Sequence, residues 1–200
     1  MKNNFYFVGL GGQGIIKLSE IIAHYGMEIG EKVKYFKNVG LAQRGGSAHG
    51  EVRIGNVFGS RIPPFSADVI ISMEFSETLK AIPFIKPEGI IILNDHKIYP
   101  IDMMAETEKY PKDEDVVNLL NKSKAKLVCI NAASIAEEIK FPKAENIILL
   151  GVLAQLFSLE EKSLLKVLKK HVPDRFIDIN LIAFYKGINI AKTISLNKKN

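Results

Sequence analysis

The sequence has little cysteine, no tryptophan and few arginines, and these shortages exclude several classes of protein. Its 200 residues include one cysteine, Cys129. One thiol cannot form a disulfide framework, nor supply the roughly four thiolates that hold an iron–sulfur cluster. No apolar run reaches the roughly 20 residues of a membrane span. We therefore expect a cytoplasmic protein that carries no cluster of its own and does not enter a membrane.

The positive net charge of +5 comes from lysine, with 23 lysines against four arginines. Recognition of bases and stacking on them favour arginine over lysine. The lysines are also scattered along the chain. This pattern predicts a solvated surface, and we expect no nucleic-acid partner; a surface that binds an acidic or nucleic-acid partner is the alternative.

Short continuous apolar runs alternate with helical patterns along the chain. The runs are 5–8, 69–71, 90–93 and 127–130. Runs that are apolar on both faces are typical of parallel strands covered by helices on each side. Between the first two runs, apolar residues at three- and four-residue steps from Ile15 to Ile29 predict a helix. The stretch from Ala48 to Ile54 alternates instead, which predicts a strand near a sheet edge with one solvated face that carries Glu51.

The last third of the sequence is helical in pattern. Residues 147–157 are almost wholly apolar, which predicts a buried helix. Taken together, the patterns predict an α/β protein with a doubly wound, mainly parallel, Rossmann-like sheet and a C-terminal helical extension. We expect residues 1–200 to form a single domain.

A glycine-rich loop follows the first predicted strand and opens the first helix. It consists of Gly9, Gly11, Gly12, Gln13 and Gly14, with Leu10 inside it. Glycines there permit positive φ angles, and the helix N-terminus offers free N–H groups to an anion. A dinucleotide site also requires an acid after the second strand, about 20 residues on. That strand, predicted at 32–36, is followed by Lys37 and Asn38. Three alternatives stay open: a tight turn, a site for a phosphate-bearing cofactor, or a contact with a partner subunit.

A second glycine-rich loop follows the second predicted strand. It contains Arg44, Gly45, Gly46 and Ser47. Loops at the carboxyl ends of parallel strands gather around one crevice, so we expect Gln13, Arg44 and Ser47 to converge there. The guanidinium of Arg44 matches a carboxylate or a phosphate. An ordinary surface arginine in a glycine turn is the alternative.

These two loops, in this order, carry a family resemblance. The first loop, then Gln43 to Ser47, then Val52-Arg53-Ile54 resemble the gamma-domain family of 2-oxoacid:ferredoxin oxidoreductases. Further matches run from Ala67-Asp68 through Asn94 and Asn146 to Asn180, so that the resemblance covers roughly residues 4–191. Within the family, the chain is most similar to the small subunits of the indolepyruvate type. Gamma subunits specific for pyruvate, 2-oxoglutarate or branched-chain oxoacids are the alternative.

The resemblance implies a function in oxidative decarboxylation. Enzymes of this family convert a 2-oxoacid and coenzyme A to an acyl-CoA and CO₂, and they pass two electrons to ferredoxin. It implies a large partner subunit that holds thiamine diphosphate, Mg²⁺ and [4Fe-4S] clusters, and a small subunit that is inactive alone and has no catalytic or metal-binding residue. The residues of the two glycine loops are then the candidates for contact with coenzyme A, with thiamine diphosphate or with the partner. A stand-alone dinucleotide-binding protein and a non-catalytic coenzyme A-binding module are the competing hypotheses.

Four other residues could be taken for parts of a site. Glu74 and Glu77 lie one helical turn apart, and we interpret them as structural because a helix N-terminus favours carboxylates. His96 follows a predicted strand end and could face the crevice. Cys129 lies within an apolar strand, so we expect it to fill the core.

Overall fold

The computed structural model describes residues 3–40, 46–98, 111 and 113–197. The strands are β1 (Asn3–Leu10), β2 (Val33–Val39), β3 (Ser47–Ile54), β4 (Ala67–Ser72), β5 (Ile85–Asn94) and β6 (Lys126–Ile130). The helices are α1 (Ile15–Glu28), α2 (Thr78–Ala81), α3 (Asp113–Lys122), α4 (Ala132–Glu138), α5 (Glu145–Leu156), α6 (Glu161–His171) and α7 (Ile177–Asn197). Short 3₁₀ turns lie at Ile82–Phe84, Pro142–Ala144 and Asp174–Phe176.

The six strands form one mixed sheet in the order β2-β3-β1-β4-β5-β6. Strands β1, β4, β5 and β6 are parallel neighbours, whereas β3 runs antiparallel to both β1 and β2. The predicted α/β class and the mainly parallel sheet are confirmed. One feature departs from a Rossmann sheet: β3 separates β2 from β1, so that β2 takes the edge and β3 lies one strand inside it.

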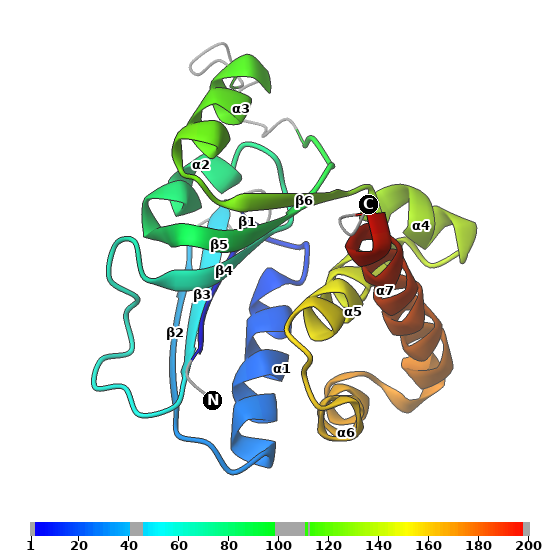
Figure 1. Ribbon diagram of the computed structural model, residues 1–200. Helices are drawn as coiled ribbons and strands as arrows, with labels where there is room; N and C mark the ends of the chain where they lie inside the picture. The colour runs from blue at the N-terminus through cyan, green and yellow to red at the C-terminus, as the bar shows by residue number, and fades with distance from the viewer. Residues whose placement is uncertain (1–2, 41–45, 99–110, 112, 198–200) are drawn as a thin grey trace.

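The two faces of the sheet are covered by different helices (Figure 1). Helices α1, α5, α6 and α7 lie on one face, with a core that includes Phe5, Phe7 and Ile71 from the strands. Helices α2 and α3 lie on the other, against Tyr6 and Val8. Alternate residues of β1 therefore serve opposite cores, as the pleat of a strand requires.

Helix α5 is buried on every side, as its apolar sequence predicts, because α7 packs across it. The two helices meet at a pair of glycines. A Cβ on Gly151 would lie 2.0 Å from the carbonyl oxygen of Phe184, and one on Gly187 would lie 2.0 Å from that of Ile148. Only glycine permits this close crossing. The predicted C-terminal helical extension is therefore a layer over the sheet, fastened through α5.

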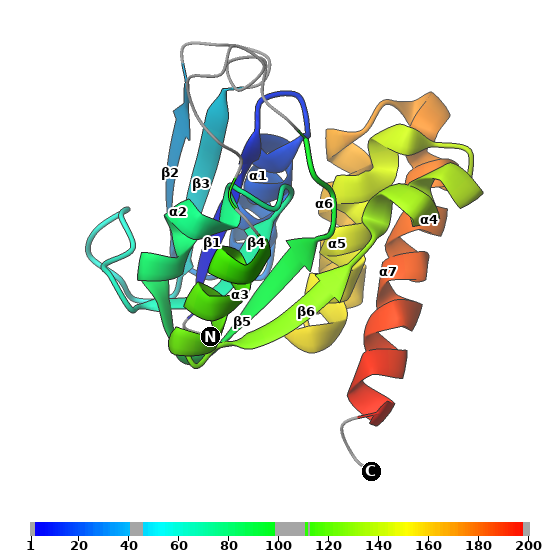
Figure 2. The ribbon, with the colours of Figure 1, turned by 90° about the horizontal axis from the view of Figure 1, so that it is seen from above.

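A crevice forms where the chain changes face. Strand β1 leads into α1 on one face, and β4 leads into α2 on the other (Figure 2). The connections diverge from the carboxyl ends of these two adjacent strands. In open α/β sheets such a switch point is where ligands bind. The fold thus predicts a site between the ends of β1 and β4.

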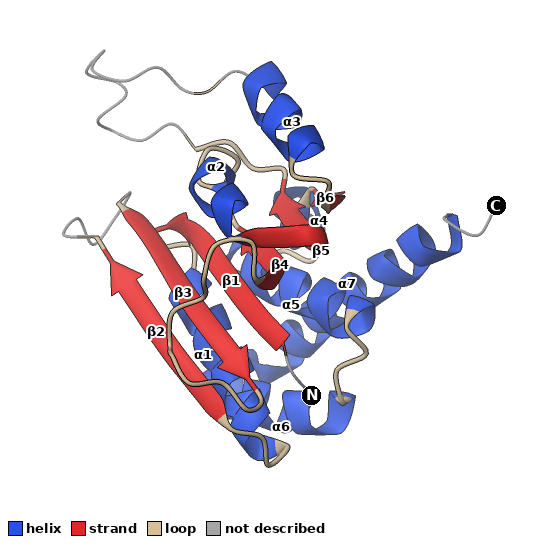
Figure 3. Ribbon diagram, turned by 60° about the vertical axis from the view of Figure 1, so that its left-hand side comes forward, coloured by secondary structure: helices blue, strands red, loops and turns tan. Residues whose placement is uncertain are grey.

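Two predictions about individual strands are wrong. The outer face of β3 is not solvated at Glu51, whose side chain is fully buried. The loop between β3 and β4 passes over this face (Figure 3), and Ile62 N–H donates to Glu51 Oε2. Cys129 does not fill the core but is exposed, because its face of the edge strand β6 is left uncovered, whereas the other face buries Val128 and Ile130. Within the described residues, no helix is both long and apolar enough to span a bilayer.

Candidate functional site

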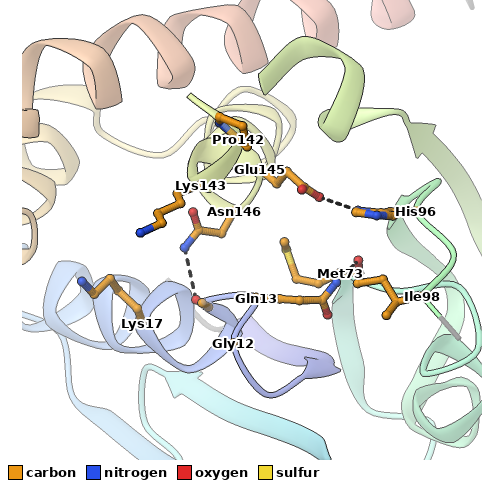
Figure 4. Close-up of a pocket in the computed structure, with 11 residues that line it drawn as sticks. Gly12, Gln13, Lys17, Met73, His96, Ile98, Pro142, Lys143, Glu145 and Asn146 are labelled. Carbon is orange, nitrogen blue, oxygen red and sulfur yellow. Dashed lines mark hydrogen bonds and ion pairs between the residues drawn. The ribbon is translucent and has the colours of Figure 1, made fainter. Parts of the chain in front are cut away.

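A cavity of about 500 Å³ lies at the carboxyl ends of β1, β4 and β5, on the side of α1 and α5 (Figure 4). Four segments supply its walls: the first glycine loop, the residues after β4 and β5, and the start of α5. The lining residues are Gly12, Gln13, Gly14, Lys17, Met73, His96, Ile98, Pro142, Lys143, Glu145 and Asn146. The cavity therefore lies at the switch point that the topology defines.

Two glycines shape the first loop. Gly14 has φ +76°, and a Cβ there would lie 2.4 Å from Asn146 Nδ2. Asn146 Nδ2 donates to the carbonyl oxygen of Gly14, which fastens the loop to α5. Gly12 has φ +101° and no atom within 4 Å of an added Cβ, so its backbone borders open space. Gly14 thus serves packing, whereas Gly12 leaves room for a ligand.

Gln13 lines the cavity, but its amide is used within the protein. Its Oε1 accepts from Leu10 N–H at 2.7 Å, and its Nε2 donates to the carbonyl oxygen of Met73 at 3.0 Å. These bonds span the switch point and hold the glycine loop to the end of β4. The side chain therefore braces the loop, and the loop's backbone is what borders the cavity.

Positive charge is concentrated on one side of the cavity. Lys17, in the first turn of α1, and Lys143, just before α5, lie together on that side (Figure 4). Within the described residues, neither amine has an ion-pair partner within 4 Å. The N-terminus of α1 has no side-chain cap and no acid in its first turn. Free N–H groups and unpaired lysines at one place favour a phosphate or carboxylate.

A hydrogen-bonded acid and histidine form the opposite side. His96 Nδ1 lies 2.9 Å from Glu145 Oε2, and Asn94 Nδ2 donates to the same oxygen at 2.7 Å. Asn94 is fully buried and also accepts from Ala132 N–H. The end of β5 therefore orients Glu145, which in turn orients the His96 ring, and the prediction that His96 could face the crevice is confirmed.

Asn146 contributes an unused acceptor. The residue is 6% exposed, and its Oδ1 has no hydrogen-bond partner within the described residues. A buried polar atom without a partner is costly, so such an atom in a cavity wall is suited to a ligand's donor. The cavity thus offers cations for an anion and a carbonyl oxygen for a hydroxyl or amine.

The second glycine loop contacts the first through its backbone, but its Ser47 side chain does not reach the cavity. Gly11 N–H donates to the carbonyl oxygen of Gly46 at 2.8 Å, so the two loops touch at their backbones. Ser47 faces away from the cavity, and its hydroxyl donates to Glu77 Oε2 at 2.5 Å. Gly9 and Gly11 are not among the lining residues. Arg44 and Gly45 lie outside the described residues, so their role stays a prediction.

The carboxylates of the opposite face are closed off. Glu74 is fully buried, and its Oε2 accepts from Ser76 N–H, Ser76 Oγ–H and Glu77 N–H. Glu77 is 3% exposed and also pairs with Lys80 at 2.6 Å. Each has its acceptors occupied by the protein. Their geometry agrees with the structural interpretation of these two acids.

A third buried acid, Glu51, lies in the same layer. It pairs with Arg61 at 2.7 Å. Desolvation lowers the pKa of its neighbour His49 below the ordinary value, and the Glu51 charge partly offsets that. Burial, aided by Glu51, raises the pKa of Tyr6 to about 12. This layer keeps His49 and Tyr6 neutral near pH 7, and neither residue lines the cavity of about 500 Å³.

The sheet order also weighs against a dinucleotide site. In a Rossmann site the acid that holds the ribose ends the strand next to β1. Here β3 occupies that place, and the end of β2 lies two strands away, roughly 10 Å from β1. The missing acid after residue 36 and the topology thus agree.

Sequence reasoning missed much of the cavity wall. Lys17 could have been found, because it lies three residues after Gly14 on the first helical turn. At Asn146 the sequence offers only a point of family resemblance. Lys143 and Glu145 carried no sequence signal, because nothing local to residues 142–146 says that α5 begins opposite the glycine loop.

The fold and the cavity define a doubly wound α/β protein with a lysine-lined cavity at its switch point. A family model described as pyruvate ferredoxin/flavodoxin oxidoreductase matches residues 4–190, and the chain belongs to this family. It is 37% identical over 193 residues to the indolepyruvate oxidoreductase subunit IorB of Methanothermobacter thermautotrophicus, covering 96% of this chain and 98% of that protein.

Two solved structures share the fold. The keto/oxoacid ferredoxin oxidoreductase gamma subunit from Geobacter sulfurreducens has a TM-score of 0.71 and 21% identity, covering 96% of this chain and 99% of that one. The 2-oxoglutarate:ferredoxin oxidoreductase from Magnetococcus marinus, with 2-oxoglutarate, coenzyme A and succinyl-CoA bound, has a TM-score of 0.73 and 23% identity. That match covers 96% of this chain and 31% of the longer chain.

Proposed function

We propose that this chain is the small subunit of an indolepyruvate ferredoxin oxidoreductase and that its cavity binds coenzyme A. Three observations support the assignment. The family model spans residues 4–190, a relative of nearly equal length is a subunit of indolepyruvate oxidoreductase, and a structure of the same fold belongs to an enzyme with coenzyme A bound. Coenzyme A accepts the acyl group of the decarboxylated oxoacid.

The observation that carries the coenzyme A assignment is the meeting of Lys17, Lys143 and the uncapped start of α1 at one cavity. Coenzyme A has a diphosphate and a 3′-phosphate, and such groups bind at helix N-termini and beside cations. We assign the phosphates to this side, with Gly12 leaving space for them. Asn146 Oδ1 is placed to accept from a ligand hydroxyl or amine.

A second cavity adjoins the first and extends it. It has about 210 Å³, and both cavities are lined by Lys17, Lys143 and Asn146. Its remaining walls include Phe141 and Phe176, whose ring centroids are 5.4 Å apart. Two adjoining cavities that share a pair of lysines, one of them with aromatic walls, suit a ligand with phosphates beside an aromatic base.

The remaining chemistry belongs to a partner. One cysteine cannot hold a cluster, so electrons pass through another chain. We assign thiamine diphosphate, Mg²⁺ and the clusters to a large subunit, and we propose that residues 1–200 act as one cytoplasmic domain that is inactive alone. Reconstitution tests this directly. A large subunit with full arylpyruvate activity on its own would refute the need for this chain.

The coenzyme A site is tested in the assembled enzyme with Lys17→Gln and Lys143→Gln. Each loses one charge-assisted contact, so we expect the KM for coenzyme A to rise about tenfold, with kcat and the KM for the oxoacid nearly unchanged. The rise should shrink at high salt, because screening weakens the wild-type contact. Lys186→Gln, a surface lysine paired with Glu138, is the matched control. An unchanged KM in both cavity variants would place coenzyme A elsewhere.

A further inference from the structure

Two histidines face each other on the outside of the helical layer, away from the proposed coenzyme A cavity. His24 on α1 is exposed and His171 ends α6. The His24 Nδ1 atom lies 2.8 Å from His171 Nε2, and the ring centroids are 4.8 Å apart. They border a cavity of about 280 Å³ that is also lined by Met27, Glu28, Val167 and Lys170. Two imidazole rings from different helices therefore meet at the opening of one cavity, where their nitrogens are potential metal ligands.

The hydrogen bonds fix which nitrogen of His171 carries a proton. His171 Nδ1 lies 3.0 Å from the carbonyl oxygen of Val167, and a carbonyl only accepts. Nδ1 is therefore the protonated nitrogen, and Nε2 has a free lone pair in the neutral ring. A second ring nitrogen that donates to a backbone carbonyl is the usual orientation of a metal-binding histidine. In the present pair, His24 Nδ1–H donates to that lone pair.

We infer that His24 and His171 form a surface site for a divalent transition metal of the Ni²⁺ or Cu²⁺ type. If the proton of His24 moves to its Nε2, both facing nitrogens have free lone pairs. With metal–nitrogen bonds of about 2.0–2.1 Å, two ligands at a right angle lie about 2.9 Å apart, and two tetrahedral ligands about 3.3 Å. The observed 2.8 Å matches the right angle, which octahedral and tetragonal ions prefer. In this structure the two nitrogens face each other along a hydrogen bond, so metal binding requires both rings to turn until their lone pairs meet over the cavity.

The surroundings contribute charges of both signs. His171 is the last residue of α6, whose C-terminal dipole favours a cation. Glu28 follows His24 by one turn on α1 and pairs with Lys166. Lys170 lines the same cavity and opposes a cation. No three histidine, cysteine or acidic side chains gather around a point anywhere in the described part of the chain. The site thus has two protein ligands, and water completes the coordination.

Calorimetric titration of the tag-free full chain with Ni²⁺ alone, near neutral pH, tests the site. We expect saturable binding of one ion, weakened about tenfold or more by either His24→Gln or His171→Gln. His96→Gln is the matched control, because His96 also has a ring nitrogen beside another potential ligand, Glu145. It should leave the affinity unchanged. Lys170→Gln should strengthen binding about two- to threefold, since it removes the opposing charge.

A second measurement separates metal binding from misfolding. Ni²⁺ should raise the melting temperature of the wild type, because an ion bound only to the native state stabilises it. It should not do so for His24→Gln or His171→Gln, whose melting temperatures in a chelator are the check on folding. The site is refuted if Ni²⁺ shows no saturable binding to the wild type. It is equally refuted if both variants bind as the wild type does, or if His96→Gln is the one that loses the ion.

Discussion

The two faces of the sheet carry opposite chemistry at the carboxyl end of β1. On the α1 side, Lys17 and Lys143 border an open cavity and have no ion-pair partner among the described residues. On the α2 side, Glu51, Glu74 and Glu77 are buried, and protein donors meet the carboxylates of Glu74 and Glu77. Glu51 accepts from Ile62 N–H at one oxygen and forms an ion pair with Arg61 at the other. The same strand thus separates a cationic, unfilled layer from an anionic, filled one.

The contrast between the two faces separates charged side chains that stabilise the fold from charged side chains that are available to bind a ligand. A buried charge that is fully hydrogen-bonded already has its partners, so its removal costs stability. A charge beside a cavity without a partner costs little to remove and changes binding instead. Residue type alone does not separate the two, because each layer is built of ordinary lysines, glutamates, histidines and serines.

The largest effect is expected at Glu74. Glu74→Ala leaves Ser76 N–H and Glu77 N–H buried without their acceptor, so we expect the free energy of unfolding to fall by about 3–4 kcal/mol. The melting temperature would drop by roughly 6–16 °C for a chain of this size. Calorimetry measures the change, with Glu138→Ala on the surface as the control. A loss below about 1 kcal/mol would show that Glu74 contributes little to stability, which would contradict the structural role assigned to the carboxylates of the α2 side.

A smaller loss of stability is expected at Ser47, which the sequence placed in the binding loop. Ser47→Ala removes a hydrogen bond to the buried carboxylate of Glu77, worth about 1.5–3 kcal/mol. The affinity of the assembled enzyme for coenzyme A should not change. Urea unfolding and coenzyme A kinetics on the same variant separate the two roles. A raised KM for coenzyme A with unchanged stability would show that Ser47 contacts the ligand and does not stabilise the fold.

Gly12 and Gly30 form a matched pair for the cavity side. Both have positive φ angles and no atom within 4 Å of an added Cβ, but only Gly12 lines the cavity. Alanine should cost each about 1–2 kcal/mol of stability through backbone strain. Only Gly12→Ala should also raise the KM for coenzyme A, because its methyl group occupies ligand space. Equal kinetics in the two variants would show that the loop does not touch the ligand.

The smallest effect is a pH dependence of stability from His49, which faces Glu51, Arg61 and Tyr6. Burial lowers its pKa, so below its ordinary value of 6.5 the unfolded state takes up a proton that the native state does not. Stability is therefore lost as the pH falls through that value toward the lowered pKa. His49→Gln should flatten this part of the profile, measured by denaturant unfolding from about pH 7.5 to about pH 5. Identical slopes would mean that His49 titrates as it does in the unfolded chain.

Much of the fold follows from local sequence. The apolar runs predict β1, β4 and β5 because buried parallel strands need apolar residues on both faces. The same rule was wrong for Cys129, because position within the sheet, and not the run itself, decides whether a strand is covered. The alternation at 48–54 located β3 correctly but missed that a distant loop would bury Glu51.

The sequence by itself determined the α/β class, the glycine loop at a strand–helix turn and the lack of cluster ligands. These depend on residue type and short spacing, which are local properties of a chain. Only the tertiary structure decided that β3 would separate β2 from β1, that Lys143 and Asn146 would face Gly12 and Gly14, and that Ser47 would face Glu77. Those pairings join segments 30 to more than 100 residues apart, so no local preference sets them. The packing of α5 brings Lys143 and Asn146 to the first glycine loop, whereas the order of the strands and the start of α2 bring Ser47 to Glu77.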